Sequence, residues 1–229
     1  MTILCIETST SCCSAAISVD GQTLASRGNL IGANHASELP VFIEQLLSEA
    51  KQNNWKLDAV ALSQGPGSYT GLRIGTSIAK GLCYGLNIPL IPIDTLQILC
   101  VAAIEKSNQL PQNATLCPML DARRMEVYTS FYTREGVRKE EVMAKIVDQT
   151  FLEGLTNEPI YFFGNGSEKC KEIIILDNAH FIDSIVPEAK YMDRLVEKSA
   201  QLDIKQLAYY EPFYLKEFVA APSHIKGLK

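Results

Sequence analysis

The chain has 229 residues, with 21 Lys and Arg against 26 Asp and Glu, so its formal net charge is −5. This length can bury a sizeable core in one or two domains, and a hydrophobic share of 47% is too high for a disordered chain. The acidic balance excludes a global attraction to nucleic acid or anionic membranes. No apolar run approaches the roughly 20 residues of a spanning helix, and the N-terminus lacks the basic start of a signal peptide. We therefore expect a soluble cytoplasmic protein without membrane contact.

The first half of the chain predicts alternating strands and helices. Asp20-Gly21 is a hairpin turn signal. The apolar residues from Leu39 to Ala50 recur with the period of an amphipathic helix, which Asn34 or Ser37 can cap and which tolerates Pro40 only in its first turn. In chain order we predict strands at 3–8, 14–19 and 22–28, a helix at 34–50, a strand at 57–63, a helix ending near 85, a strand at 88–93 and a helix at 95–106 capped by Thr95.

The second half repeats this order in shorter form, after a segment at 108–113 that reads as a linker. We predict strands at 115–120, 126–133 and 142–147, a short helix at 151–155, a strand at 160–163, a turn into helix from 164 and a long final helix at 188–202. The aromatic tail from Tyr209 is expected to be loose. The pattern indicates two α/β lobes, residues 1–107 and a smaller lobe at 108–229.

The seven cysteines and three histidines suggest no metal site. The cysteines are odd in number and form no CxxC pair, so we expect buried free thiols in a reducing compartment. His35, His180 and His224 are isolated in the sequence. None has the spacing of a zinc motif, so we predict that this chain binds no metal.

A glycine-rich segment, Gly65 to Gly71, lies between a predicted strand and a predicted helix. Backbone N–H groups at such a place can hold an anion. The segment is neither a dinucleotide fingerprint nor a P-loop. A structural turn and a ligand loop both remain open. The ligand interpretation makes a nucleotide or anion loop of Glu7, Thr8, Ser9, Gly67 and Ser68.

The helix that follows contains several glycines, each of which costs about 1 kcal/mol relative to Ala. Gly71, Gly75 and Ala79 share one face. Such a face favours close approach of another backbone, which is either the protein's own sheet or a helix of another chain.

Glu7 and Asp121 end corresponding strands of the two lobes. They could face a cleft that holds a magnesium nucleotide, or Asp121 could cap or pair with Arg123 or Arg124.

Four segments carry a specific resemblance to one family. They are ILCIETST at 3–10, SQGPGSYTGLRIGTSIAKGL at 63–82, MLDARRMEVY at 119–128 and PFYLK at 212–216. These segments resemble the TsaB (YeaZ) family, most strongly over the first 130 residues or so. The resemblance implies an α/β, duplicated actin/sugar-kinase/Hsp70-like (ribonuclease H-like) fold with a truncated second lobe.

The resemblance also implies a function in tRNA modification. The family takes part in threonylcarbamoylation of adenosine 37 in tRNAs that read codons beginning with A. A member would be a non-catalytic accessory subunit that dimerises with and activates the catalytic paralogue TsaD, and the ATPase TsaE would join them. This chain would require no cofactor, because ATP and metal are used by the partner subunits. It would meet tRNA only through the complex.

Two positions favour the accessory role over a catalytic one. Catalytic relatives carry a metal-binding H-x-x-x-H after the edge strand, where this chain has Asp94 and Ile98. One carboxylate and one alkyl chain cannot replace two imidazoles. His35 and Glu38 match a family position, but a single histidine cannot hold the metal. We therefore expect no catalysis by this chain alone.

The expected partner interface lies on the two helices of the first lobe, and an isolated chain is expected to form a homodimer through it. Its residues are His35, Glu38, Leu39, Phe42, Leu46, Gly71, Ile74, Gly75, Ile78, Ala79 and Leu82. The alternatives are a small ATP-dependent phosphotransferase or peptidase-like enzyme of the same fold, and an interaction module unrelated to tRNA.

Overall fold

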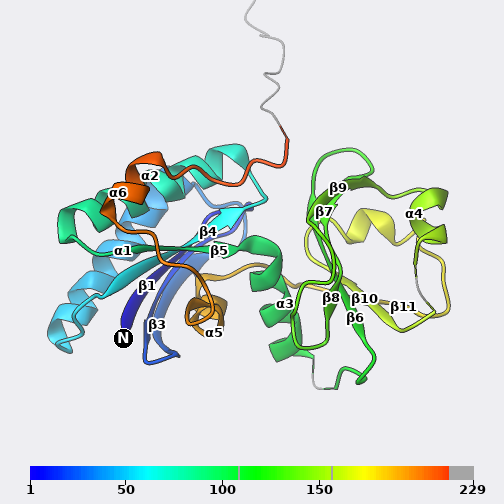
Figure 1. Cartoon of the computed structure of the whole chain (residues 1–229), viewed down its shortest axis with the longest axis horizontal. Helices are drawn as coiled ribbons and strands as arrows, with labels where there is room; N and C mark the ends of the chain where they lie inside the picture. The colour runs from blue at the N-terminus through cyan, green and yellow to red at the C-terminus, as the bar shows by residue number, and fades with distance from the viewer. Residues whose placement is uncertain (108, 156, 217–229) are drawn as a thin grey trace, which may run out of the picture.

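The computed structural model describes residues 1–107, 109–155 and 157–216, and two α/β lobes lie side by side along its long axis (Figure 1). The first lobe contains a five-stranded sheet in the order β3-β2-β1-β4-β5. β1 is antiparallel to β2 and parallel to β4. The strands are β1 (Thr2–Glu7), β2 (Cys13–Val19), β3 (Gln22–Asn29), β4 (Ala59–Gly65) and β5 (Leu90–Asp94).

Three helices alternate with these strands along the first half of the chain, and all three were predicted. They are α1 (His35–Gln52), α2 (Tyr69–Leu86) and α3 (Thr95–Lys106). The α3 cap is Asp94 rather than Thr95, because the Asp94 carboxylate accepts from the amides of Leu96 and Gln97. Asn34 holds the α1 cap position without a side-chain hydrogen bond, and Pro40 lies beyond the first turn. The hairpin at Asp20-Gly21 is confirmed, since both residues have positive φ.

The second lobe repeats the first with shortened helices. Its six-stranded sheet has the order β11-β10-β6-β7-β9, with β8 paired to β6, and it combines parallel and antiparallel neighbours as the first sheet does. A five-residue helix and a 3₁₀ turn stand where the first lobe has α1 and α2. This confirms the predicted duplication with a truncated second copy. The elements are β6 (Thr115–Asp121), β7 (Glu126–Thr129), β8 (Tyr132–Thr133), β9 (Met143–Ile146), α4 (Gln149–Glu153), β10 (Ile160–Phe163), η1 (Glu168–Cys170) and β11 (Ala179–Ile182).

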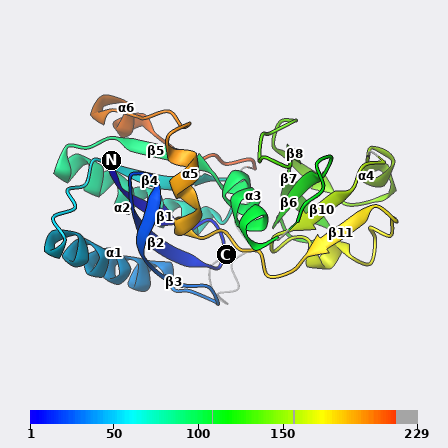
Figure 2. The ribbon, with the colours of Figure 1, turned by 90° about the horizontal axis from the view of Figure 1, so that it is seen from below.

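After β11 the chain returns to the first lobe, which corrects two predictions. The helix predicted at 188–202 is instead η2 (Ala189–Met192), α5 (Asp193–Val196) and an extended segment. Leu202 exchanges main-chain hydrogen bonds with Leu90, which satisfies the open edge of β5. α6 (Ile204–Tyr209) then packs beside α2 (Figure 1), and Figure 2 shows α5 next to α3. Residues 189–210 therefore pack with the first lobe, although the boundary predicted at 107/108 assigns them to the second.

The hydrophobic core forms two layers around the first sheet. Leu4 and Ile6 of β1 face α1 and α2, whereas Ile3 and Cys5 face α3 and the returning segment. The α3 layer continues into the second lobe through residues such as Leu116 and Phe163, so this core cluster is shared by the two lobes. The seven free cysteines are all buried, as predicted. Across the described ranges, no helix is both long and apolar enough to cross a membrane.

Candidate functional site

A cleft of about 600 Å³ lies between the lobes. It is bounded by the loop after β1, the turn that starts α2, the β6–β7 turn and the C-terminal segment. Ser9, Ser68, Asp121 and Arg123 are among its polar lining residues. The cleft therefore joins the glycine-rich loop of the first lobe to the end of the matching strand β6 in the second.

The turn from Gly65 to Gly71 is fitted closely to the loop after β1. The Ser68 amide donates to the Ser9 carbonyl at 2.6 Å, and the Ser68 hydroxyl accepts from the Gly71 amide at 3.3 Å. A Cβ at Gly67 would collide with the Ser9 carbonyl oxygen. The structure thus brings the predicted loop residues together, but it uses the Ser68 amide, and the Gly71 amide at the start of α2, for internal hydrogen bonds. Anion binding there stays a prediction.

Glu7 is fully buried beside this turn. Its Oε1 accepts from the Ser9 amide at 2.5 Å, and its Oε2 has no hydrogen-bond partner in the part of the chain that the structure describes. Burial raises the pKa of Glu7 to about 7, although hydrogen bonds from Ser9 oppose the rise. The two carboxylates predicted at the ends of corresponding strands therefore differ in burial. Glu7 is buried, whereas Asp121 is an exposed residue on the other side of the cleft.

Asp121 is held by its neighbours in the second lobe. Its carboxylate forms an ion pair with Lys169 and accepts from the Arg123 amide at 3.1 Å. The predicted capping contact between Asp121 and Arg123 is thus a hydrogen bond from the Arg123 backbone amide to the Asp121 carboxylate. The side-chain ion pair predicted with Arg123 or Arg124 is made by Lys169 instead, which lies on η1 and which the sequence spacing did not indicate.

The glycine face of α2 packs inside this chain, which corrects its assignment to a partner interface. A Cβ at Gly71 would collide with the Thr8 carbonyl, and one at Gly75 would collide with the Thr8 hydroxyl. Ala79 is fully buried in the core between α2 and the sheet. The close approach that these small residues allow is therefore to the loop after β1 and to the protein's own sheet.

The other expected interface residues divide by exposure. Leu39 and Leu46 are fully buried in the core, so their assignment to the interface is also wrong. His35 and Glu38 are half-buried at the start of α1, where His35 Nε2 lies 3.1 Å from the Cys12 carbonyl and Glu38 accepts from the Asn34 amide. The remaining residues are half-buried and reach the surface: Phe42, Ile74, Ile78 and Leu82.

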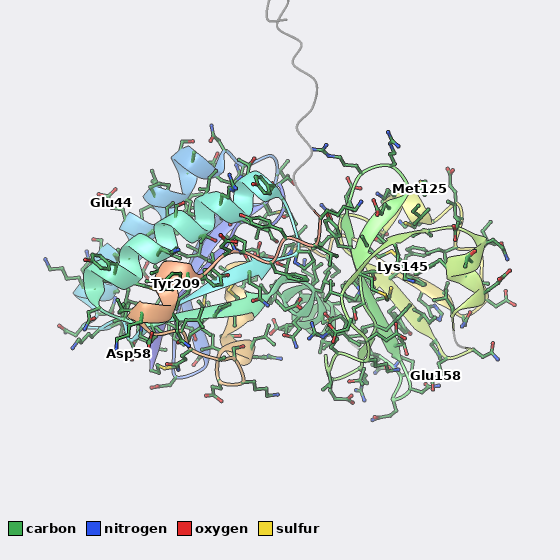
Figure 3. The ribbon with its side chains drawn as sticks, turned by 45° about the horizontal axis from the view of Figure 1, so that its top comes forward. Glu44, Asp58, Met125, Lys145, Glu158 and Tyr209 are labelled. Carbon is green, nitrogen blue, oxygen red and sulfur yellow. The ribbon has the colours of Figure 1, made fainter. Side chains whose placement is uncertain are left out.

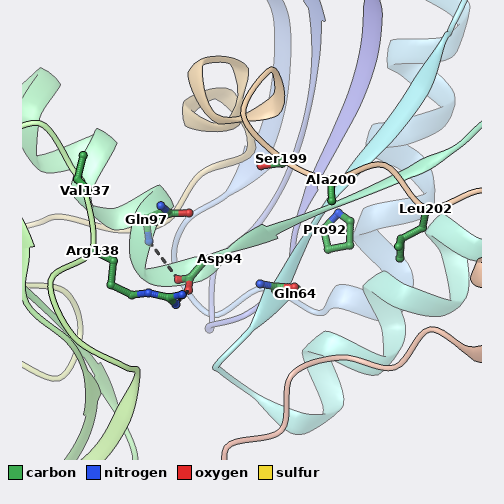
Figure 4. A pocket seen from close by; sticks show the side chains of 9 residues that line it. All are labelled: Gln64, Pro92, Asp94, Gln97, Val137, Arg138, Ser199, Ala200 and Leu202. Carbon is green, nitrogen blue, oxygen red and sulfur yellow. Dashed lines mark hydrogen bonds and ion pairs between the residues drawn. The ribbon is translucent and has the colours of Figure 1, made fainter.

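A second cavity, of about 510 Å³, lies where the end of β5 meets the second lobe (Figure 4). Asp94, which is 7% exposed, pairs with Arg138 at 3.2 Å across the lobes. Burial raises the pKa of Asp94, although its α3 hydrogen bonds and Arg138 oppose the rise. Ile98 is fully buried in the shared core. Arg138 was missed from the sequence because it lies in an ordinary polar hairpin far along the chain.

Comparisons with known proteins agree with this architecture. The chain matches the family model described as "TsaD: tRNA N6-adenosine threonylcarbamoyltransferase" over residues 29–221. YeaZ from Pseudomonas aeruginosa superposes with a TM-score of 0.77 at 25% identity, over 93% of this chain and 99% of that one. The fold thus defines a duplicated protein of two α/β lobes, related to the family of tRNA threonylcarbamoyltransferases.

Two full-length relatives narrow the assignment. The TsaB protein of Haemophilus influenzae, named for tRNA threonylcarbamoyladenosine biosynthesis, is 31% identical over 96% of this chain and 95% of its own length. The TsaB protein of Bacillus subtilis is 29% identical over the whole of both chains. The chain belongs to the TsaB family of tRNA threonylcarbamoyladenosine biosynthesis proteins.

Proposed function

We propose that this chain is a non-catalytic cytoplasmic subunit that dimerises with a TsaD-like paralogue and activates it. The complex would threonylcarbamoylate adenosine 37 of tRNAs that read codons beginning with A, and a TsaE-like ATPase would join it. ATP and metal would be used by the partners, and tRNA would be bound only through the complex. Family membership supports the pathway, and the surface of α1 and α2 supports the mode of action.

The observation that carries the proposal is the outer surface of these two helices. Small and apolar residues reach solvent there at positions that α6 leaves uncovered in the described structure. On α2, the space around Gly81 and Gly85 is open, and Tyr84 is 76% exposed. Val41 on α1 is also partly exposed. Exposed apolar side chains on two neighbouring long helices are typical of a protein interface, and open glycines allow another helix to approach closely.

Asp94 and Ile98, which stand where catalytic relatives would carry two histidines, support a non-catalytic role. Asp94 is engaged by the start of α3 and by Arg138, and Ile98 fills the core. Both side chains therefore stabilise the lobe junction. Among the residues that the structure describes, no group of three or more His, Cys, Asp or Glu side chains could hold a metal ion. A phosphotransferase role would instead require magnesium nucleotide binding by the isolated chain, which titration calorimetry measures directly.

Interface variants test the proposal. Gly81→Arg places a long cation on the open surface of α2, where a Cβ meets nothing within 4 Å, and it also improves helix propensity. We expect it to abolish co-sedimentation with the TsaD-like paralogue while the variant stays folded. The matched control is Gly154→Arg, at an exposed helix end of the second lobe. Unchanged complex formation by folded Gly81→Arg would contradict the proposed interface.

A further inference from the structure

The C-terminal strap, residues Pro212–Lys216, crosses from the first lobe to the second. After α6 the chain runs along α2 toward the second lobe, as the orange-to-red ribbon in Figure 1 shows. The tail from Tyr209 was expected to be loose, but residues up to Lys216 make specific contacts, and 217–229 lie outside the described residues. The strap also lines the interlobe cleft through Phe213, Tyr214, Leu215 and Lys216.

Main-chain and aromatic contacts attach the strap to the first lobe. The Phe213 amide donates to the Gln64 carbonyl at 2.7 Å, at the end of β4. The Tyr214 ring lies 4.8 Å from the ring of Tyr69, centroid to centroid. Arg73 lies over the other ring of this pair, 4.1 Å from the Tyr69 centroid, and its Nε donates to the Tyr214 hydroxyl at 3.4 Å. The strap is thus fixed to the N-terminal turn of α2.

The next two residues attach the strap to the second lobe. Leu215 packs against the core cluster that both lobes share. Lys216 forms an ion pair with Glu126 of β7. Glu126 is itself held within the second lobe, because its carbonyl accepts from Lys169 at 2.7 Å. The five strap residues therefore connect α2 of one lobe to β7 of the other.

The strap also lies between the two interlobe cavities. Gln64 lines the cavity of about 510 Å³ beside Asp94 (Figure 4), whereas Phe213 lines the cleft of about 600 Å³ beside Ser68. The hydrogen bond from Phe213 to Gln64 is at the boundary of these two spaces.

We propose that the C-terminal strap is a conformational clamp, which fixes the angle between the lobes and divides the interlobe space into two cavities. Release of the strap opens the lobes and makes the cleft continuous. The clamp acts within this chain, so it is independent of the partner and the pathway proposed above. It acts together with the Asp94–Arg138 pair, which joins the lobes at the other cavity.

Distance measurements between the lobes test the clamp. Spin labels at Glu44→Cys on α1 and Lys145→Cys on β9 report the separation of the lobes, because both positions are exposed (Figure 3). The native thiols are buried and leave the engineered cysteines as the reactive sites. We expect one narrow distance distribution in the full chain. In Tyr214→Ala/Lys216→Met we expect a broader distribution with a longer mean, together with faster amide exchange at 9–11 and 67–70.

Controls separate the clamp from general destabilisation. Tyr209→Ala/Lys198→Met removes an exposed tyrosine and an exposed lysine outside the strap, and should leave the distribution unchanged. Lys216→Arg keeps the ion pair and should keep the narrow distribution. If the double strap variant does not fold, the same distance measurement is made on Lys216→Met alone, which removes only the surface ion pair with Glu126. This variant should also broaden the distance distribution. A folded strap variant with the distance distribution of the unmodified chain would overturn the proposal.

Discussion

Glu7 makes the stability of the first lobe depend on pH. Its pKa of about 7 in the folded chain lies above the ordinary value of 4.5, so ionisation of Glu7 opposes folding. The penalty is absent below pH 4.5, grows between pH 4.5 and about 7, and is complete above that range. A rise from 4.5 to about 7 corresponds to about 3 kcal/mol of unfolding free energy. Glu7→Gln removes this charge and keeps an oxygen that can accept from Ser9.

Urea unfolding at pH 5 and pH 8.5 measures the effect, with the fluorescence of Trp55, the one tryptophan, as a probe in the first lobe. We expect Glu7→Gln to gain about 2.5 kcal/mol relative to the unmodified chain between these two pH values, because part of the penalty is already present at pH 5. Glu44→Gln, at an exposed glutamate of α1, is the matched control and should show no such gain. Identical pH dependence of Glu7→Gln and the unmodified chain would refute the assignment of the penalty to Glu7.

Three further outcomes follow from the packing. Gly75→Ala should lower the unfolding free energy measured in urea, because its Cβ would meet the Thr8 hydroxyl, whereas Gly81→Ala should raise it by about 1 kcal/mol; equal effects would contradict the close contact. Leu46→Ala should cost about 2–5 kcal/mol in the same assay, because Leu46 is fully buried, and a cost near zero would contradict that burial. Ellman's reagent should label the seven thiols only after unfolding; rapid labelling of the native chain would contradict their placement.

The first lobe could be predicted closely because its signals are local. The Asp20-Gly21 turn and the apolar period of α1 each act within a few residues. The return of the chain after β11 could not be predicted in this way. Apolar residues such as Met192 and Val196, four positions apart, fit a helical period, but they lie in short elements that pack against strands of the first lobe far earlier in the chain.

The site shows the same division between local and distant information. The glycine spacing in α2 correctly indicated a close backbone approach, but the spacing could not say which backbone. Thr8, the residue that Gly71 and Gly75 contact, lies more than sixty positions earlier. Arg138 and the C-terminal strap were missed for the same reason, since their partners Asp94, Gln64 and Glu126 are distant in the sequence.

Reconstitution of tRNA modification tests the central claim most directly. The TsaD-like paralogue is supplied with threonylcarbamoyl-adenylate and unmodified tRNA, with or without this chain, and adenosine 37 is analysed by mass spectrometry of the nucleosides. We predict modification only when this chain is present, and its loss with Gly81→Arg. Full modification by the paralogue alone, or modification by this chain without the paralogue, would contradict the account.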